Sequence, residues 1–288
     1  MTPLIGILLA LACALTTNVG FLFKHRGACA APAVDMRRPL YSAKSLFRSR
    51  LFAIGFLIAT VAWVFHVAAM AVAPLDLVQA VLAGGVVMLA IMAERMFGLR
   101  IRRRQWIGLG LTAVGLMLLG FTLPAQHGAH SRFSVPGMIA FEAGLLVVGT
   151  LLIMGPRIGA PKEHHGFMLG AAAGILFGVS DIAIKAISGL VGSHGVLGLL
   201  SPWLLVAIVA SVAAFYASAK GLQDGEAVPV IAVTATAANV SGIVGGILVF
   251  GDPLSGKPIM LVAECFAFAL VLVAAWLTPS PRGSVAVA

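Results

Sequence analysis

Charged residues are scarce in this chain. Asp, Glu, Lys and Arg make up 10% of its 288 residues, while apolar residues make up 60%; the charged share in ordinary soluble proteins is about 25%. A soluble domain would show charged positions recurring every turn or two of helix. Long stretches instead lack every charged residue, and each of the following exceeds the roughly 20 residues that cross a bilayer: Met1–Phe23, Leu51–Leu75, Gln105–Ser131 and Ala227–Gly251. The composition predicts an all-α, polytopic integral membrane helix bundle.

Several common motifs are also missing. The three cysteines form no C-x-x-C pair, which disfavours a disulfide framework or a zinc site. No basic residue precedes the first apolar stretch, whereas Lys24 and Arg26 follow it, so we expect a retained first span rather than a cleaved signal peptide. There is no G-x-x-x-x-G-K-[ST], no H-E-x-x-H, no G-x-S-x-G and no nucleic-acid-reading motif. We therefore expect no enzyme, no bound cofactor and no nucleic-acid partner.

The basic residues that are present predict how the chain crosses the membrane. Of 19 Lys and Arg residues, 16 fall on one side when nine spans are assigned; Arg132 and Lys257 fall on the other, and Lys185 lies within a span. Because short basic loops stay in the cytoplasm, we predict a multi-pass cell-membrane protein with its N-terminus outside and its C-terminus inside. The predicted spans are 3–23, 51–73, 75–96, 104–123, 135–155, 166–188, 200–220, 227–249 and 257–278.

The segments outside the spans also carry expectations. The connection 24–50 holds too many charges to cross the bilayer and is a candidate interfacial segment. The tail 279–288 is expected to be disordered.

Within the spans, the Gly/Ala-rich segment Ala10–Lys24 lines up with Ala171–Lys185, each ending in an aligned lysine. Such internal sequence repeats are typical of transporter folds. We expect a single transporter domain with repeats at about 1–123 and 135–278.

Four segments resemble one family, in order along the chain. Residues 21–27 (FLFKHRG) resemble an F-x-x-K-K-x-G helix ending. Residues 71–74 (AVAP), followed by Leu77-Val78 and by ERM at 94–96, resemble A-x-A-P…L-V…E-R-L. Residues 181–189 (DIAIKAISG) resemble V-M-S-V-K-A-x-G, which aligns Lys185 with a family lysine. Val228-Pro229-Val230 with Asp252-Pro253 resembles V-P-x-Y…F-x-E-W.

By these segments the chain resembles the NIPA-type magnesium transporters of the drug/metabolite transporter superfamily, whose bacterial relatives carry EamA domains. The resemblance covers nearly the whole chain and implies nine spans. The chain departs from the pattern in three places: the span between Pro74 and Glu94 is shorter by about one turn, Asp252 stands where the family has Glu, and no Tyr follows Pro229. The resemblance implies a carrier, with Mg²⁺ as the possible transported ion.

An ionisable residue inside a span indicates a structural or functional role, because placing each one at mid-bilayer costs about 2.5–3.5 kcal/mol of insertion free energy. Glu142, Asp181 and Glu264 each lie about seven residues from the outer end of a span, hence about 11 Å deep. His66 falls at a similar depth, and Asp76 lies near the outer mouth. Three carboxylates at one level predict an acidic vestibule whose oxygens would ligate a hard cation such as Mg²⁺.

Each of these residues also has a structural interpretation. Asp181 and Lys185, at i and i+4, either form a neutralising pair or act as a gate in which a cation or proton displaces the lysine. Glu142 and Glu264 are either functional or are protonated and hydrogen-bonded. Three polar residues, His66, Asn18 and Asn239, also have two interpretations. They serve either helix packing and interhelical hydrogen bonds or contact with the solute.

These features leave three functions open. The first is a transporter that moves a divalent cation such as magnesium across the cytoplasmic membrane. The second is an EamA-like exporter or exchanger of a small organic metabolite, coupled to protons through Glu142 or Asp181. The third is a membrane scaffold that transports nothing. The expected partners are the lipid bilayer and a small solute or cation, and the sequence predicts no oligomeric state.

Overall fold

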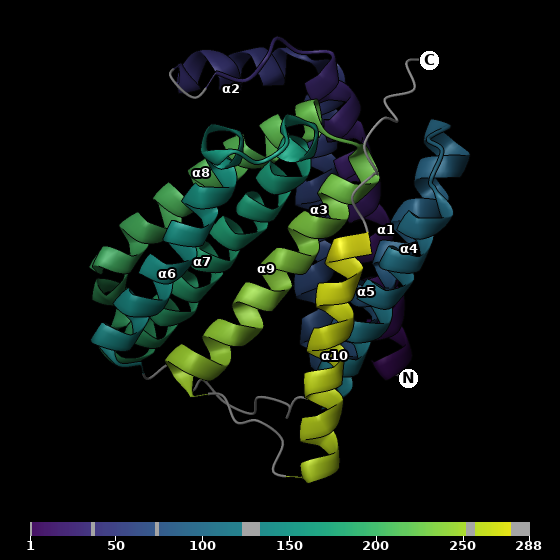
Figure 1. The fold of residues 1–288 in the computed structure, drawn as a ribbon. Coiled ribbons are helices and arrows are strands. Elements are labelled where there is room, and N and C mark those ends of the chain that lie inside the picture. The colour runs from purple at the N-terminus through teal and green to yellow at the C-terminus, as the bar shows by residue number, and fades with distance from the viewer. Residues whose placement is uncertain (1, 36–37, 73–74, 123–132, 252–256, 278–288) are drawn as a thin grey trace. The chain divides into compact units, whose positions relative to one another are not determined.

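The computed structural model describes residues 2–35, 38–72, 75–122, 133–251 and 257–277. Within these residues all regular structure is helical, and no strand occurs (Figure 1). Five of the described helices are long and apolar enough to cross a membrane, or six if one bent pair counts as a single span. The all-α, polytopic architecture predicted from the composition is confirmed.

Helices of 19 residues or more occupy the positions of all nine predicted spans within the described part of the chain. They are α1 (Thr2–Cys29), α3 (Arg50–Val72), α4 (Leu75–Phe97), α5 (Arg103–Thr122), α6 (Val135–Ile153), α7 (His165–His194), α8 (Pro202–Asp224), α9 (Ala227–Phe250) and α10 (Pro258–Leu277). A tenth helix, α2 (Pro39–Arg48), forms within the charged connection 24–50. Three short 3₁₀ turns complete the described structure: η1 (Gly155–Ile158), η2 (Lys162–His164) and η3 (Gly195–Leu200).

Several helices run beyond the predicted span ends, and α1 and α7 do so by the most residues. Helix α1 continues about two turns past residue 23, and α7 continues to His194. Charge marked the predicted end of the first span, yet the Nζ atom of Lys24 lies 3.8 Å from the centroid of the Phe21 ring. This cation–π contact, together with the packing of the lysine stem against Gly55, lets a charged residue continue the helix.

One compact unit consists of 1–125, 225–232 and 255–288. In it α1 packs against α3 and α4, while α5 packs against α4 and α10. Glycines permit the close approaches. A Cβ at Gly55 would lie 2.6 Å from the backbone O of Gly20, and one at Gly115 would lie 2.8 Å from Cγ2 of Val271. This unit therefore has its tightest helix contacts where side chains are smallest.

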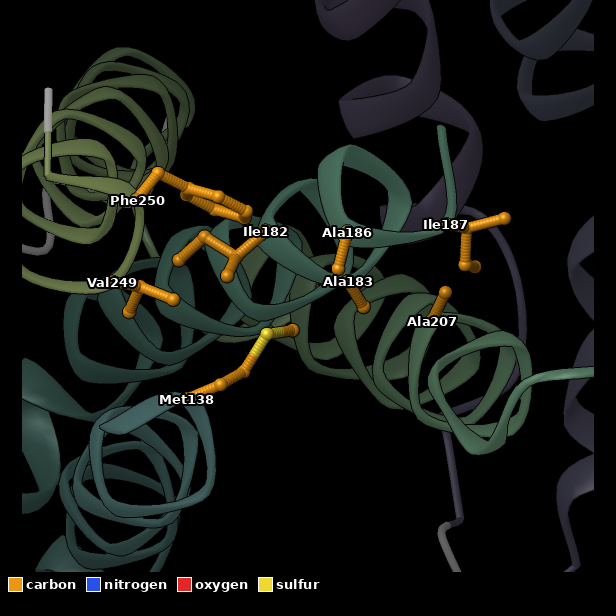
Figure 2. Packing of buried hydrophobic residues seen from close by; sticks show 8 residues of the cluster. All are labelled: Met138, Ile182, Ala183, Ala186, Ile187, Ala207, Val249 and Phe250. Atoms are coloured by element: carbon orange, nitrogen blue, oxygen red, sulfur yellow. The ribbon is translucent and has the colours of Figure 1, made fainter. Parts of the chain in front are cut away.

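The second unit consists of 126–224 and 233–254. Here α7 packs against α6 and α8, and Gly174 and Gly178 bring it against α9. Figure 2 shows part of its core, in which Met138 of α6 lies by Ile182 and Ala183 of α7, with Val249 and Phe250 contributed by α9. The units group α10 with the first five helices, whereas the predicted repeats group it with the second half; the repeats stay a prediction.

Some predictions lie outside the described residues. These concern the tail 279–288, the loop residue Arg132, the Asp252-Pro253 pair and the side chain of Asp76, although Asp76 itself falls within α4.

Candidate functional site

The packing of α6 on α7 brings two predicted acidic positions to one level. The helices run antiparallel, because Met138 near the start of α6 clusters with Ile182 of α7, while a Cβ on Gly149 would lie 3.8 Å from Cγ2 of the earlier residue Ile175. Glu142 lies between Met138 and Gly149. Interpolating along this register places Glu142 level with the turn of α7 that carries Asp181.

Glu142 is the most unusual of the predicted site residues. Its side chain is 4% exposed, and its Oε1 atom has no hydrogen-bond partner among the described residues. Buried polar atoms are nearly always hydrogen-bonded, because leaving one without a partner costs about 1–3 kcal/mol. An apolar side chain at this position would avoid that cost. The carboxyl group is therefore a candidate for function rather than for packing.

Asp181 lies on a part of α7 that is anchored by its neighbour Ser180. The Ser180 hydroxyl lies 2.7 Å from the Ser211 hydroxyl of α8 and donates a 3.2 Å hydrogen bond to the carbonyl oxygen of Ala207. Asp181 itself is exposed within the chain. Ser180 was not among the predicted site residues, although serines in two apolar spans are a signal for interhelical hydrogen bonds. This bonding fixes the height of Asp181 relative to α8.

Lys185 lies one turn beyond Asp181 and contacts α9. Its Nζ atom is 4.4 Å from the centroid of the Phe250 ring, within the range of a cation–π interaction. Sequence reasoning considered only Asp181 as a contact for this ammonium group. The neutralising pair and the gate both stay predictions, and the structure adds an aromatic face against which the lysine rests.

Helix α9 passes close to α7 and carries another predicted residue. The closest approaches are at Gly174, Gly178 and Gly245, and the Thr234 hydroxyl donates a 2.9 Å hydrogen bond to the carbonyl oxygen of Gly170. Because Gly174 faces Ala237 and Gly178 faces Ser241, the two helices run in the same direction. Asn239 lies between those contacts and is exposed. Its solute contact stays a prediction.

The other predicted residues belong to the first unit. Asn18 of α1 is buried, and its Nδ2 atom donates a 2.7 Å hydrogen bond to the carbonyl oxygen of Gly85 in α4. His66 of α3 is half-buried. Glu264 of α10 is 1% exposed and is one of the largest fully buried side chains among the described residues. Asn18 thus joins two helices, while the roles of His66 and Glu264 stay predictions.

The described residues of the two units contain no preformed metal site with three side-chain ligands. Among the described residues, no three His, Cys, Asp or Glu side chains form a group that could hold a metal ion. Glu142 and Asp181 belong to one unit and Glu264 to the other, and each unit is described by itself. The layer of three carboxylates, and its assignment as a set of metal ligands, therefore stays a prediction.

Polar contacts at the helix ends were also missed. Arg26 donates a 3.2 Å hydrogen bond from Nη2 to the carbonyl oxygen of Phe97, and its guanidinium lies 4.7 Å from the centroid of that residue's ring. Gln105 donates a 2.7 Å hydrogen bond from Nε2 to Oε2 of Glu226. Both contacts join segments far apart in sequence, so no local pattern predicts them.

The long apolar helices define a polytopic membrane protein. The family described as magnesium transporter NIPA matches residues 1–283, and the chain belongs to this family. The chain is 23% identical over 267 residues to "Probable magnesium transporter NIPA9" from Arabidopsis thaliana, covering 88% of this chain and 75% of the relative. It is 28% identical over 229 residues to an uncharacterized protein of Corynebacterium glutamicum, covering 76% of each. No solved structure matches it.

Proposed function

We propose that this protein carries a divalent cation, magnesium being the expected one, across the cell membrane. The observation that carries the proposal is the buried carboxyl group of Glu142, whose Oε1 atom has no hydrogen-bond partner among the described residues. Glu142 also lies level with Asp181 in the same unit. Membership of a family of magnesium transporters, and the name of the Arabidopsis relative, favour the same cargo.

The proposed ligands suit the chemistry of Mg²⁺. This ion prefers oxygen ligands, gives up its water shell reluctantly, and is usually bound through one or two carboxylates with several waters retained. Glu142 and Asp181 provide two carboxylates on neighbouring helices. A full set of protein ligands is therefore unnecessary, which fits the lack of a preformed group of three among the described residues.

The membrane potential is a sufficient driving force for this cargo. Moving one charge through about 100 mV is worth about 2.3 kcal/mol, so a dication entering a negative cytoplasm gains about 4.6 kcal/mol. That corresponds to roughly three decades of accumulation. Uptake thus needs no ATP, in agreement with a sequence that contains no phosphate-binding loop.

Lys185 is proposed to balance the carboxylates when no ion is bound. It lies one helical turn from Asp181, and its flexible stem can move the ammonium group between the Phe250 ring and the acidic turn. An arriving dication would displace the lysine from that turn. In this proposal the aromatic ring receives the ammonium group during transport.

The test is Mg²⁺ flux into vesicles containing the purified protein. We expect E142Q and D181N each to abolish flux while membrane insertion and the elution profile stay unchanged. The matched control is E163Q, because Glu163 is exposed and lies in η2; it should transport as the unmodified protein does. Full activity in both E142Q and D181N would remove these carboxylates from the mechanism.

A parallel panel separates this function from the alternatives. Flux of Mg²⁺ or Co²⁺ with no other solute present supports the cation carrier. Flux of an organic metabolite that requires a proton gradient would instead favour the exporter. No flux of any solute, from a protein that is folded and inserted, would favour a scaffold.

A further inference from the structure

Helix α2 has an exposed face that combines apolar and basic side chains. At 3.6 residues per turn, Leu40, Tyr41, Lys44, Phe47 and Arg48 fall within an arc of about 120°. Leu40 is 85% exposed, Tyr41 61% and Phe47 42%, and both basic residues are exposed as well. We call these five residues the α2 outer face. The mixture of bulky apolar and cationic side chains is typical of helices that lie in a membrane interface.

The opposite face of α2 is attached to the rest of its unit. Ser42, Ser45 and Leu46 are buried. The Ser42 hydroxyl accepts a 2.9 Å hydrogen bond from the backbone N–H of Asp35 and donates a 3.0 Å hydrogen bond to the carbonyl oxygen of the same residue. The buried face thus attaches α2 to its unit, whereas the five residues of the outer face are exposed, although Phe47 also contacts α3.

The orientation of α2 follows from its junction with α3. The axis of α2 meets the segment Arg50–His66 of α3 at 92°. If α3 crosses the bilayer, as the span prediction requires, then α2 lies parallel to the membrane plane. Its position between the first two spans, in the most basic connection of the chain, places it at the cytoplasmic surface.

The aromatic contacts of Phe47 show which way the outer face points. Its ring packs edge-on against the rings of Phe52 and Phe56, with centroids 5.5 and 5.2 Å away. Phe56 lies about one and a half turns into α3, toward the hydrocarbon. The outer face, which contains Phe47, therefore turns toward the bilayer, while the side of α2 bonded to Asp35 turns away from it.

From this geometry we infer that the α2 outer face binds the cytoplasmic leaflet directly, with Leu40 and Phe47 among the upper acyl chains and Lys44 and Arg48 against anionic phospholipid headgroups. Basic residues near an anionic surface each contribute about fivefold in affinity, and aromatic rings favour the headgroup level. The helix would thereby couple the ends of α1 and α3 to the charge of the surrounding lipid.

Spin labels in the full chain test where the outer face lies. In a variant whose three cysteines are replaced by alanine, we would label L40C and, as the control, A33C. Ala33 is exposed and lies two residues before Asp35, which is bonded to Ser42 on the buried face of α2. Both proteins would be placed in vesicles of equimolar phosphatidylcholine and phosphatidylglycerol. Collisions with oxygen, which concentrates in hydrocarbon, and with a neutral nickel chelate, which stays in water, would be measured for each label.

We expect the ratio of oxygen to nickel collisions to be several-fold higher at position 40 than at position 33. Equal ratios at the two positions would place the outer face in water and overturn the inference. Protection of position 40 from both reagents would mean that protein covers this face, either the rest of the chain or a second copy, and would overturn it as well.

The role of the charges has its own test. Replacing phosphatidylcholine vesicles by the equimolar mixture should raise the ratio of oxygen to nickel collisions at position 40. K44Q/R48Q should lose that rise, because two basic groups together raise the affinity for an anionic membrane by up to about thirtyfold. The matched control is R95Q/R100Q, whose two arginines are exposed and belong to the next basic connection; it should keep the rise. A rise that persists in K44Q/R48Q contradicts a headgroup role for these residues.

Discussion

Replacing Gly174 by alanine should push α7 and α9 apart. A Cβ at Gly174 would lie 2.7 Å from the Cβ of Ala237, where ordinary contacts begin near 3.4 Å, and it would also collide with the backbone oxygen of Thr234. The helices must separate locally by at least 0.7 Å, the difference between these two distances. That movement also stretches the buried 2.9 Å hydrogen bond from Thr234 to Gly170.

The cost can be estimated from general packing energetics. Overfilling a packed site costs about 1–3 kcal/mol, and a strained buried hydrogen bond adds up to about 1 kcal/mol. Alanine regains about 1 kcal/mol through its higher helix propensity. We therefore expect G174A to destabilise the protein by about 0–3 kcal/mol, which lowers the thermal unfolding midpoint by up to roughly 10 °C for a chain of this size. Relative to a glycine replaced in open space, which gains the same helix propensity, the cost is about 1–4 kcal/mol.

The matched control is G242A. Gly242 is a helical glycine of α9, and a Cβ placed there would meet no atom of the described residues within 4 Å. It should leave the midpoint unchanged or raise it slightly through helix propensity. The assay is thermal unfolding of the purified protein in detergent, followed by loss of the monodisperse elution peak. A G174A protein as stable as G242A would refute the packing of α7 against α9 described above.

Three further outcomes are expected. S180A should lower the unfolding free energy by about 1 kcal/mol, because it removes the two hydrogen bonds that the Ser180 hydroxyl makes with α8. Chemical denaturation in detergent would detect this loss as a midpoint at lower denaturant concentration, and an unchanged midpoint would contradict those bonds. N18A should cost about 1 kcal/mol through loss of the bond to Gly85, whereas N239A, on an exposed residue, should be near neutral in the same assay; equal effects would contradict this assignment. A membrane-impermeant thiol reagent added outside cells should label K257C and not R102C, and the reverse pattern would overturn the predicted orientation.

The positions of the helices could be predicted because the physical signal is local. Hydrocarbon excludes charge, so the gaps between charged residues define the spans, and basic loops mark where each span must end. The end of α1 lies beyond the predicted span end because packing contacts accommodate charge there. Lys24 continues α1 because Phe21 and Gly55 surround it, and nothing near Lys24 in the sequence identifies Gly55 as its neighbour.

The candidate site was less accessible to sequence reasoning. Glu142 and Asp181 attract attention because charge is expensive inside a span, and counting residues from the span ends gave them a common depth, which the register of α6 on α7 supports. The anchoring of α7 by Ser180 and the contact of Lys185 with Phe250 depend on which helices are neighbours and on how they are rotated. Spans that are apolar on every side give no hydrophobic periodicity from which that rotation could be predicted.

The central claim is that a dication passes through this protein down its electrical gradient, by way of Glu142 and Asp181. The most direct measurement is Mg²⁺ entry into vesicles that carry the protein, detected by a membrane-impermeant Mg²⁺ indicator dye trapped inside them. An inside-negative potential is imposed during the measurement and is then reversed. The account predicts entry that rises steeply with inside-negative potential, stops when the potential is reversed, and is absent in E142Q. Entry that ignores the potential, or that persists unchanged in E142Q, would contradict it.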